Sequence, residues 1–340
     1  MRLRDSRLIA KFVALVLAAL LGAFILYADQ PGGVADQQAG VNSGDVATLK
    51  VTTEVVNVYS IVREKKGRLI ADLKEDDFQL LEDGTPQTIR YFSRETDTPL
   101  TIGMLIDTSP SQVRVLGVEQ QEADRFLRQV MRPQKDLTCV IQFDTEVELI
   151  QDFTDNLSYL TRAIDSTVVH SPAGGPLPAP VPGSSVGGTH LYDAVYLAAT
   201  QMMKGQVGRK VIILLSDGVD QGSTIERDRA VEAAQKADLI IYSVDVSDPS
   251  FYWGHGGGFA GGSSLKKFSE ETGGRVIHVD RPEKTAAAFQ ELADELRTQY
   301  LLGYSPTNTR RDGSFRKIRV NVRGGNYKVQ ARNGYYAPSN

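Results

Sequence analysis

The chain has 340 residues, of which 41% are hydrophobic and 24% charged, and its formal net charge at pH 7 is −4. This length predicts about two domains. The slight acidic excess argues against a nucleic-acid-binding protein, and a single cysteine, Cys139, excludes an internal disulfide.

Residues 1–28 have the pattern of an export segment. Basic residues up to Lys11 precede an uncharged apolar stretch, Phe12 to Ala28. The basic flank is expected to stay in the cytoplasm, and the rest of the chain to reach the periplasm or cell surface. The stretch is slightly shorter than the roughly 20 residues of a spanning helix and longer than most signal-peptide cores, so a cleaved signal peptide and a membrane anchor both stay open. The poor cleavage sequence Leu26-Tyr27-Ala28 favours an anchor, and residues 29–47, rich in Gly, Gln and Asp, are expected to form a flexible linker.

Residues 48–96 change to short β-branched runs without helical periodicity. The turn signals are Lys65-Lys66-Gly67 and Glu82-Asp83-Gly84. The strands expected around these turns are Leu49–Val62, Phe78–Leu81 and Thr88–Phe92. A sheet of this size would be marginal alone, so we expect more strands from elsewhere in the chain.

Residues 97–302 alternate short apolar runs with stretches of helical period. The expected buried strands are 100–106, 138–143, 211–215, 239–244 and 275–279, and the expected helices are 113–130, 191–203, 225–237 and 283–298. This alternation predicts an α/β fold with a doubly wound, mostly parallel sheet. The run 147–153 follows its predecessor too closely for a crossover, so we expect it to form an antiparallel edge strand.

Oxygen-bearing side chains follow two of these expected strands. An Asp-x-Ser-x-Ser sequence begins at Asp107, and a second aspartate, Asp217, follows the run 211–215. In a doubly wound sheet both aspartates reach the crevice at the carboxyl ends of the strands. A hydroxyl, Thr189, stands just before a helical stretch. Carboxylate and hydroxyl oxygens are hard ligands that suit Mg²⁺ or Mn²⁺ and not zinc, so the candidate metal ligands are Asp107, Ser109, Ser111, Thr189 and Asp217.

This set resembles the metal-ion-dependent adhesion site, or MIDAS, of von Willebrand factor type A (VWA) domains. The resemblance implies that Ser109 and Ser111 bind the metal directly and that Thr189 binds it directly or through water. It implies that Asp107 and Asp217 act largely through water. An Asp or Glu carboxylate of a protein partner would then take the remaining position.

Residues 303–340 offer the strands that the amino-terminal sheet lacks. Phe315–Arg323 alternates apolar and charged residues, Gly324-Gly325-Asn326 marks a turn, and Tyr327–Ala331 follows. We expect one small β-sandwich made from both chain ends, with the α/β domain inserted into it. A bacterial VWA-related family is similar in these parts, which implies architecture more than activity; the similar segments are Gly67-Arg-Leu-Ile-Ala-Asp-Leu73, Asp77-Phe78, Glu82-Asp83-Gly84 and Ala331-Arg-Asn-Gly-Tyr-Tyr336.

Two loops leave their roles open. The loop 170–188, rich in proline, is either a flap over the metal or a tolerated insertion. The loop 247–264 places Phe251-Tyr252-Trp253 either against a partner or against the core. Its glycines match G-x-G-x-x-G from Gly256, but the preceding strand ends near Val246, so no nucleotide cofactor is expected.

The sequence favours a non-enzymatic, cation-dependent protein-binding module outside the cytoplasmic membrane, attached to it if residues 1–28 are retained. No nucleophile with a matching base is recognisable beside the candidate ligands, which argues against an enzyme. The alternatives are an accessory subunit of a chelatase-like or protein-maturation machine, a metal-dependent hydrolase in the same crevice, and a site that needs no metal.

Overall fold

The computed structural model describes residues 54–95, 97–169, 188–246, 261–279 and 281–339. These residues belong to one compact unit, Thr52–Asn340. The expected export segment and linker, and nearly all of the two loops just discussed, lie outside the described residues. Within the part that is described, no helix is both long and apolar enough to cross a membrane.

The centre of the α/β part is a six-stranded sheet with the order β10-β9-β8-β5-β6-β7. Its strands are β5 (Leu100–Asp107), β6 (Leu137–Phe143), β7 (Val147–Thr154), β8 (Arg209–Leu215), β9 (Leu239–Asp245) and β10 (Val276–His278). All neighbours are parallel except β7, which runs antiparallel to β6 at the edge. Every residue of β5 is buried, and the chain continues from β5 to one side and returns on its other side as β8. The doubly wound sheet with one antiparallel edge strand is therefore confirmed.

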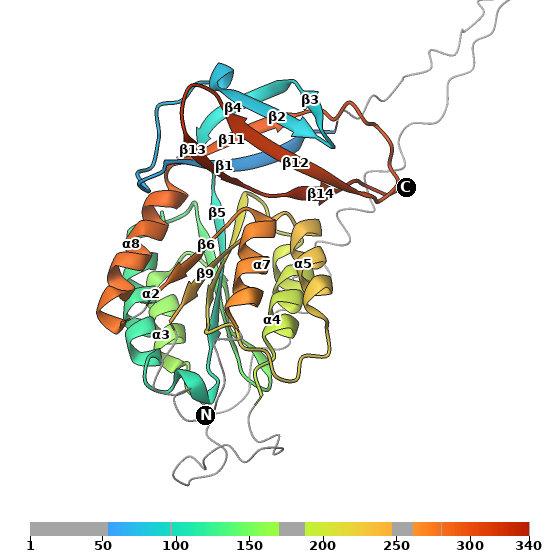
Figure 1. Ribbon diagram of the computed structural model, residues 1–340. Helices are drawn as coiled ribbons and strands as arrows, with labels where there is room; N and C mark the ends of the chain where they lie inside the picture. The colour runs from blue at the N-terminus through green and yellow to red at the C-terminus, as the bar shows by residue number, and fades with distance from the viewer. Residues whose placement is uncertain (1–53, 96, 170–187, 247–260, 280, 340) are drawn as a thin grey trace, which may run out of the picture. The chain divides into compact units, whose positions relative to one another are not determined.

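Helices cover both faces of this sheet (Figure 1). One face carries α2 (Leu116–Val130), α3 (Leu157–Ser166) and α8 (Thr285–Leu296), and the other carries α4 (Leu191–Leu197), its π-helical continuation η3 (Ala198–Met203), α5 (Arg227–Lys236) and α7 (Gly262–Thr272). The alternation of strand side chains divides the core accordingly. In β5, Ile102, Met104 and Ile106 pack toward the α2 side, whereas Leu105 packs toward the α4 side.

Two of these helices were not expected from the sequence. Helix α3 begins at an N-cap, where the side chain of Asn156 accepts a hydrogen bond from the Ser158 N–H at 2.9 Å. The helix is short and partly polar, so its apolar periodicity is weak in the sequence. Helix α7 starts with Gly-Ser-Ser, residues of low helix propensity, directly after a glycine-rich stretch. Its burial against β9 outweighs that weak local preference, since Leu265 and Phe268 are fully buried.

Two four-stranded antiparallel sheets, built from both chain ends, form the second part of the unit. The first has the order β13-β1-β11-β4, and the second the order β14-β12-β2-β3. The strands are β1 (Val56–Glu64), β2 (Phe78–Glu82), β3 (Thr85–Gln87), β4 (Ile89–Glu95), β11 (Gln299–Tyr304), β12 (Phe315–Val322), β13 (Tyr327–Ala331) and β14 (Gly334–Tyr336). One hydrophobic cluster joins the sheets, with Val58 and Tyr300 from the first and Leu80 and Ile318 from the second. This is a β-sandwich.

Strand β11 was not expected. It pairs with both β1 and β4, so the domain boundary expected at residue 302 falls inside a strand of the sandwich. The reason is local: α8 ends at Leu296, and the apolar sequence Gln299–Tyr304 follows almost at once, without a turn signal to separate helix from strand.

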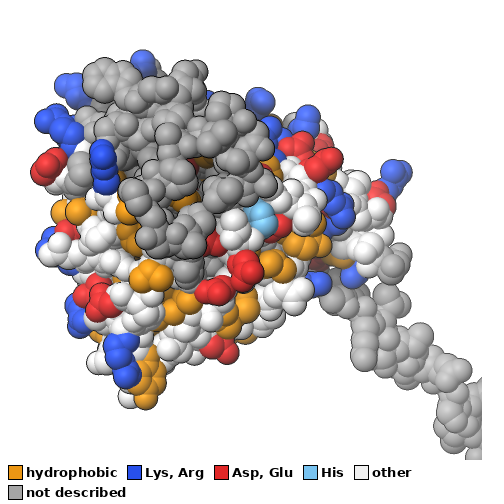
Figure 2. Space-filling model, turned by 90° about the horizontal axis from the view of Figure 1, so that it is seen from below, with side chains coloured by type: hydrophobic (Ala, Val, Ile, Leu, Met, Phe, Trp, Pro, Cys, Tyr) orange, Lys and Arg blue, Asp and Glu red, His pale blue; other side chains and the backbone are white. Residues whose placement is uncertain are grey.

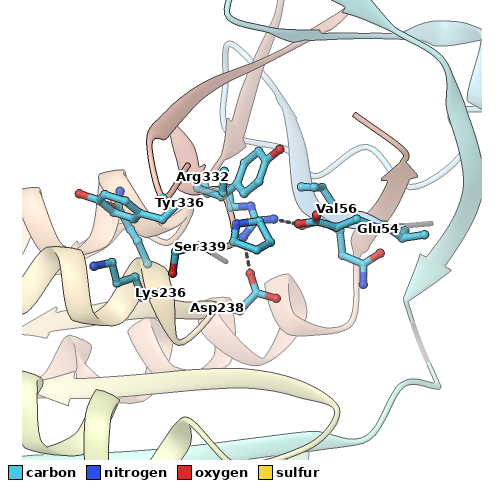
Figure 3. A pocket seen from close by; sticks show the side chains of 14 residues that line it. Glu54, Val56, Lys236, Asp238, Arg332, Tyr336 and Ser339 are labelled. Carbon is cyan, nitrogen blue, oxygen red and sulfur yellow. Dashed lines mark hydrogen bonds and ion pairs between the residues drawn. The ribbon is translucent and has the colours of Figure 1, made fainter. Parts of the chain in front are cut away.

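A hollow of about 490 Å³ lies between the end of α5 and the sandwich (Figure 3). Both ends of the described chain contribute to it, through Glu54 and Ser339. Arg332 crosses it, forming an ion pair with Asp238 and donating to the Asn57 carbonyl oxygen. Through these two contacts, Arg332 connects the α/β part to the sandwich.

Candidate metal centre

Four of the five candidate ligands lie at or just after the carboxyl ends of β5 and β8, which are neighbours at the centre of the sheet, and the fifth, Thr189, precedes α4. Figure 2 looks onto this end of the α/β part, where acidic side chains stand beside apolar ones among the described residues. Asp107 is the last residue of β5 and its side chain is fully buried. Two hydrogen bonds fix its carboxylate: Oδ1 accepts from the Ser109 N–H at 2.9 Å, and Oδ2 accepts from the Ser216 hydroxyl at 2.6 Å.

The two serines occupy the turn that follows β5. Thr108 ties this turn to the end of β6, because its N–H donates to the Phe143 carbonyl oxygen at 2.9 Å. Ser109 then stands before the 3-10 helix η2 (Pro110–Gln112), with Pro110 at the first helical position, where a missing N–H costs nothing. The hydroxyl oxygens of Ser109 and Ser111 come to 3.1 Å from each other. The Asp-x-Ser-x-Ser turn thus gathers its oxygens on one side.

Asp217 follows β8 and is 5% exposed. Its Oδ1 accepts a hydrogen bond from the Val219 N–H at 3.0 Å, and the hydroxyl of Ser216 accepts from the Gly218 N–H at the same distance. Gly218 has φ +79°, and a Cβ at this position would lie 2.4 Å from the Gly261 carbonyl oxygen. Only glycine fits at position 218. The turn that this glycine allows follows Asp217 directly and helps to hold it beside Asp107.

Thr189 reaches the same end of the sheet from the start of α4. It pairs with Gln221 through backbone hydrogen bonds of 3.1 and 2.9 Å, so its segment is fastened to the loop after Asp217. The next residue, His190, donates its N–H to the Asp144 carbonyl oxygen at 2.6 Å, which adds an attachment to the β6–β7 turn. Thr189 is 7% exposed.

The electrostatics of this arrangement call for a positive charge. Burial, together with the negative charge of Asp217, raises the pKa of Asp107 to about 7. No Lys or Arg side chain of the described residues forms an ion pair with Asp107. A buried carboxyl group with a second carboxyl group beside it ionises readily when a cation lies close to it. The hydroxyl and carboxylate donor set fits a hard divalent cation.

The order of the strands and the antiparallel edge reproduce the fold that the sequence resemblance implies. The α/β part of this chain has a VWA-like fold, and we call it the VWA-like domain. Within the described residues, no three His, Cys, Asp or Glu side chains are grouped to hold a metal ion.

No protein-family model matches the sequence, and comparison with curated proteins gives no match either. Solved structures similar to this chain include proximal thread matrix protein 1 from the mussel byssus, with a TM-score of 0.47 and 16% identity over 64% of this chain. The chain spans about half of that protein's length, 51%. The mussel protein has also been solved with zinc in its MIDAS motif.

Two bacterial proteins are similar over nearly their whole length. The von Willebrand factor domain of the pilus tip protein Mfa5 from Porphyromonas gingivalis has a TM-score of 0.42 and 14% identity, over 58% of this chain and 95% of its own. An aerotolerance-related membrane protein from Bacteroides fragilis has a TM-score of 0.41 and 14% identity, over 58% of this chain and 98% of its own. At this level of identity the likenesses concern the fold alone.

Several residues support the site without having been singled out as ligands. Ser216 is the link between the two aspartate loops, and its position beside Asp217 is the signal that could have revealed it. Asp220 accepts hydrogen bonds from the Ser223 hydroxyl at 2.6 Å and from the Tyr192 N–H at 3.1 Å, so it caps the start of α4. Asp220 therefore helps to place Thr189.

Proposed function

We propose that this protein is a non-enzymatic binding protein outside the cytoplasmic membrane, and that its VWA-like domain binds a carboxylate of a partner protein through Mg²⁺ or Mn²⁺. The observation that carries the proposal is the fully buried carboxylate of Asp107, held by Ser109 and Ser216 beside Asp217 without a described cationic side chain to pair with it. A divalent cation would supply the missing positive charge.

The proposed ligands would have two different roles toward the cation. Ser109, Ser111 and Thr189 would contribute hydroxyl ligands, while Asp107 and Asp217 would hold bound waters and set the net charge. When bound, the cation supplies an open coordination position for a hard anionic ligand. An Asp or Glu side chain of the partner matches that position. The surrounding loops would provide specificity.

Two features support a binding role over catalysis, and a third supports the location. The carboxylates of Asp107 and Asp217 accept hydrogen bonds from backbone N–H groups and a serine hydroxyl, and no nucleophile is held beside them by these bonds. The single cysteine, Cys139, is buried in β6, and burial raises the pKa of its thiol to about 12, which is unsuitable for a nucleophile. The basic and apolar pattern of residues 1–28 supports export, and a retained anchor would keep the protein on the membrane.

The experiment is a calorimetric titration of the full-length protein, purified in mild detergent, with Mg²⁺ and with Mn²⁺. We expect saturable binding that is lost in Asp107→Ala, because that change removes the buried carboxylate at the centre of the site. Asp124→Ala is the matched control, since Asp124 is an aspartate of α2 whose carboxylate accepts hydrogen bonds from Arg128 and Thr161. Wild-type protein that binds neither cation would contradict the proposal. In a third titration, Zn²⁺ is added in competition with Mg²⁺. We expect Mg²⁺ to remain bound if the site prefers hard cations.

A further inference from the structure

A third acidic side chain lies behind the site. Glu119 is in the first turn of α2, and its side chain is fully buried. Neither of its carboxyl oxygens has a hydrogen-bond partner among the described residues. Burying a carboxyl group without a hydrogen-bond partner costs several kcal/mol of folding free energy. Glu119 therefore calls for a partner that is not a protein group, such as a water molecule.

The neighbours of Glu119 are those of the candidate metal centre. Burial raises the pKa of Glu119 well above its usual range, and the negative charges of Asp107 and Asp217 raise it further, so all of these carboxyl groups share one low-dielectric region. Backbone hydrogen bonds place Glu119 one turn after Val115 and Val115 one turn after Gln112, on the same inward face.

Gln112 extends this face to the proposed ligands. Its Nε2 donates to the Ser111 hydroxyl at 3.2 Å, while its Oε1 is buried without a partner among the described residues. Orphaned oxygens of Gln112 and Glu119 thus stand on the helix side of the Asp-x-Ser-x-Ser turn. Buried waters are usually found where polar groups lack other partners, because the water can donate a hydrogen bond to each unsatisfied acceptor.

We propose that Glu119 is a positioning residue of the metal centre, which accepts a hydrogen bond from a water of the cation's hydration shell on the α2 side of Asp107. This inference rests on the proposed function. A role through water is favoured over direct ligation because the described acidic side chains do not group as a set of three around one point. The carboxylate of Glu119 would add negative charge on the α2 side of the site, and the ligand set of the proposed function would stay unchanged.

The test compares Glu119→Gln with Glu122→Gln in the full-length protein. Both variants make the same change in α2, but Glu122 forms an ion pair with Arg125 instead of facing the site. We expect Glu119→Gln to weaken Mg²⁺ binding by about 10- to 100-fold in calorimetry, the usual effect of removing an outer-shell partner of a metal. Glu122→Gln should bind Mg²⁺ like the wild type.

Thermal unfolding in EDTA separates positioning from mere structural support. Glu119→Gln removes an unpaired buried acid, so its unfolding temperature in EDTA should equal or exceed that of the wild type, while the rise on adding Mg²⁺ should shrink. A fall of the unfolding temperature in EDTA, or Mg²⁺ affinity equal to the wild type, would overturn the inference. If Glu119→Gln does not fold, Glu119→Asp replaces it: weaker Mg²⁺ binding supports the inference, and unchanged binding overturns it.

The outcomes also distinguish the two proposals. Wild-type binding that is lost in Asp107→Ala but retained in Glu119→Gln overturns the role of Glu119 and leaves the proposed function standing. No binding by the wild type overturns both.

Discussion

At the level of single residues, the hydroxyl of Ser216 connects the two halves of the site. It donates to Asp107 at the end of β5 and accepts from the Gly218 N–H after β8, so one buried oxygen connects both aspartate loops. A bond to a carboxylate is stronger than one between neutral groups. The orientation of Asp107 therefore depends on a residue that is not itself a proposed ligand.

Ser216→Ala should weaken Mg²⁺ binding by about 10-fold or more, as is usual for outer-shell partners, and lower the free energy of unfolding by about 1–3 kcal/mol. Calorimetry and urea denaturation measure the two effects. Ser243→Ala is the control, because Ser243 is a buried serine of β9 whose hydroxyl pairs with that of Ser269 at 2.9 Å. A Ser243 variant that loses Mg²⁺ affinity equally would show that general loosening of the sheet, not the Asp107 contact, sets the affinity.

At the scale of elements, Asp136 fixes the start of the strand that carries the site. Its carboxylate accepts from the Leu100 N–H at 2.8 Å, from the Arg132 N–H at 2.8 Å and from the Arg132 guanidinium. Burial opposes ionisation of Asp136, yet these hydrogen bonds outweigh it and hold its pKa below the usual range. The turn between α2 and β6 is thereby joined to the first residue of β5.

A carboxyl group with a lowered pKa stabilises the fold above its unfolded pKa of about 3.9, and this stabilisation is lost as the pH falls through the folded value. Asp136→Asn should therefore lower the free energy of unfolding by about 1–3 kcal/mol near pH 6, since buried donors lose their acceptor. The difference from the wild type should shrink below about pH 4. Urea denaturation across this range checks both statements; a difference independent of pH would contradict them.

The sequence predicted those elements whose pattern is decided locally. The run from Leu100 to Ile106 is apolar on both faces, as a central parallel strand must be, and the polar turn after it was sufficient to place the candidate ligands. Helix α7 and strand β11 escaped prediction because burial overrides their weak or ambiguous local signals. Glu119 escaped because it shares the buried face of α2 with Leu116 and Ala123, where an acidic side chain is unusual.

At the scale of the whole unit, buried charges join the α/β part to the sandwich. Glu295 of α8 is fully buried and forms ion pairs with Arg63 of β1 and with Arg275. Nearby, Arg209 donates to the side chain of Gln299 at 2.8 Å and to the Leu296 carbonyl oxygen at 2.6 Å. The first set of contacts ties α8 to β1, and the second ties β8 to the end of α8 and to β11.

Glu295→Gln should lower the free energy of unfolding by about 3 kcal/mol, because it leaves the half-buried Arg63 without its charge partner and Arg275 with Glu291 as its remaining partner. Mg²⁺ affinity should not change, since these contacts lie at the sandwich, away from the carboxyl ends of β5 and β8. Urea denaturation and calorimetry on the same sample test the two parts. A parallel loss of Mg²⁺ affinity would show that the junction and the metal centre are coupled.

The pairing of β4 with β11 has a topological consequence. The chain leaves the sandwich after Glu95 and returns at Gln299, and these residues are direct partners in the antiparallel ladder. For the sandwich, the entire VWA-like domain is therefore the loop of a single β-hairpin. A tight turn of about two to five residues would close the same hairpin. The domain is thus a cassette with adjacent entry and exit points, which a host sandwich can gain, lose or exchange without altering the order of its own strands.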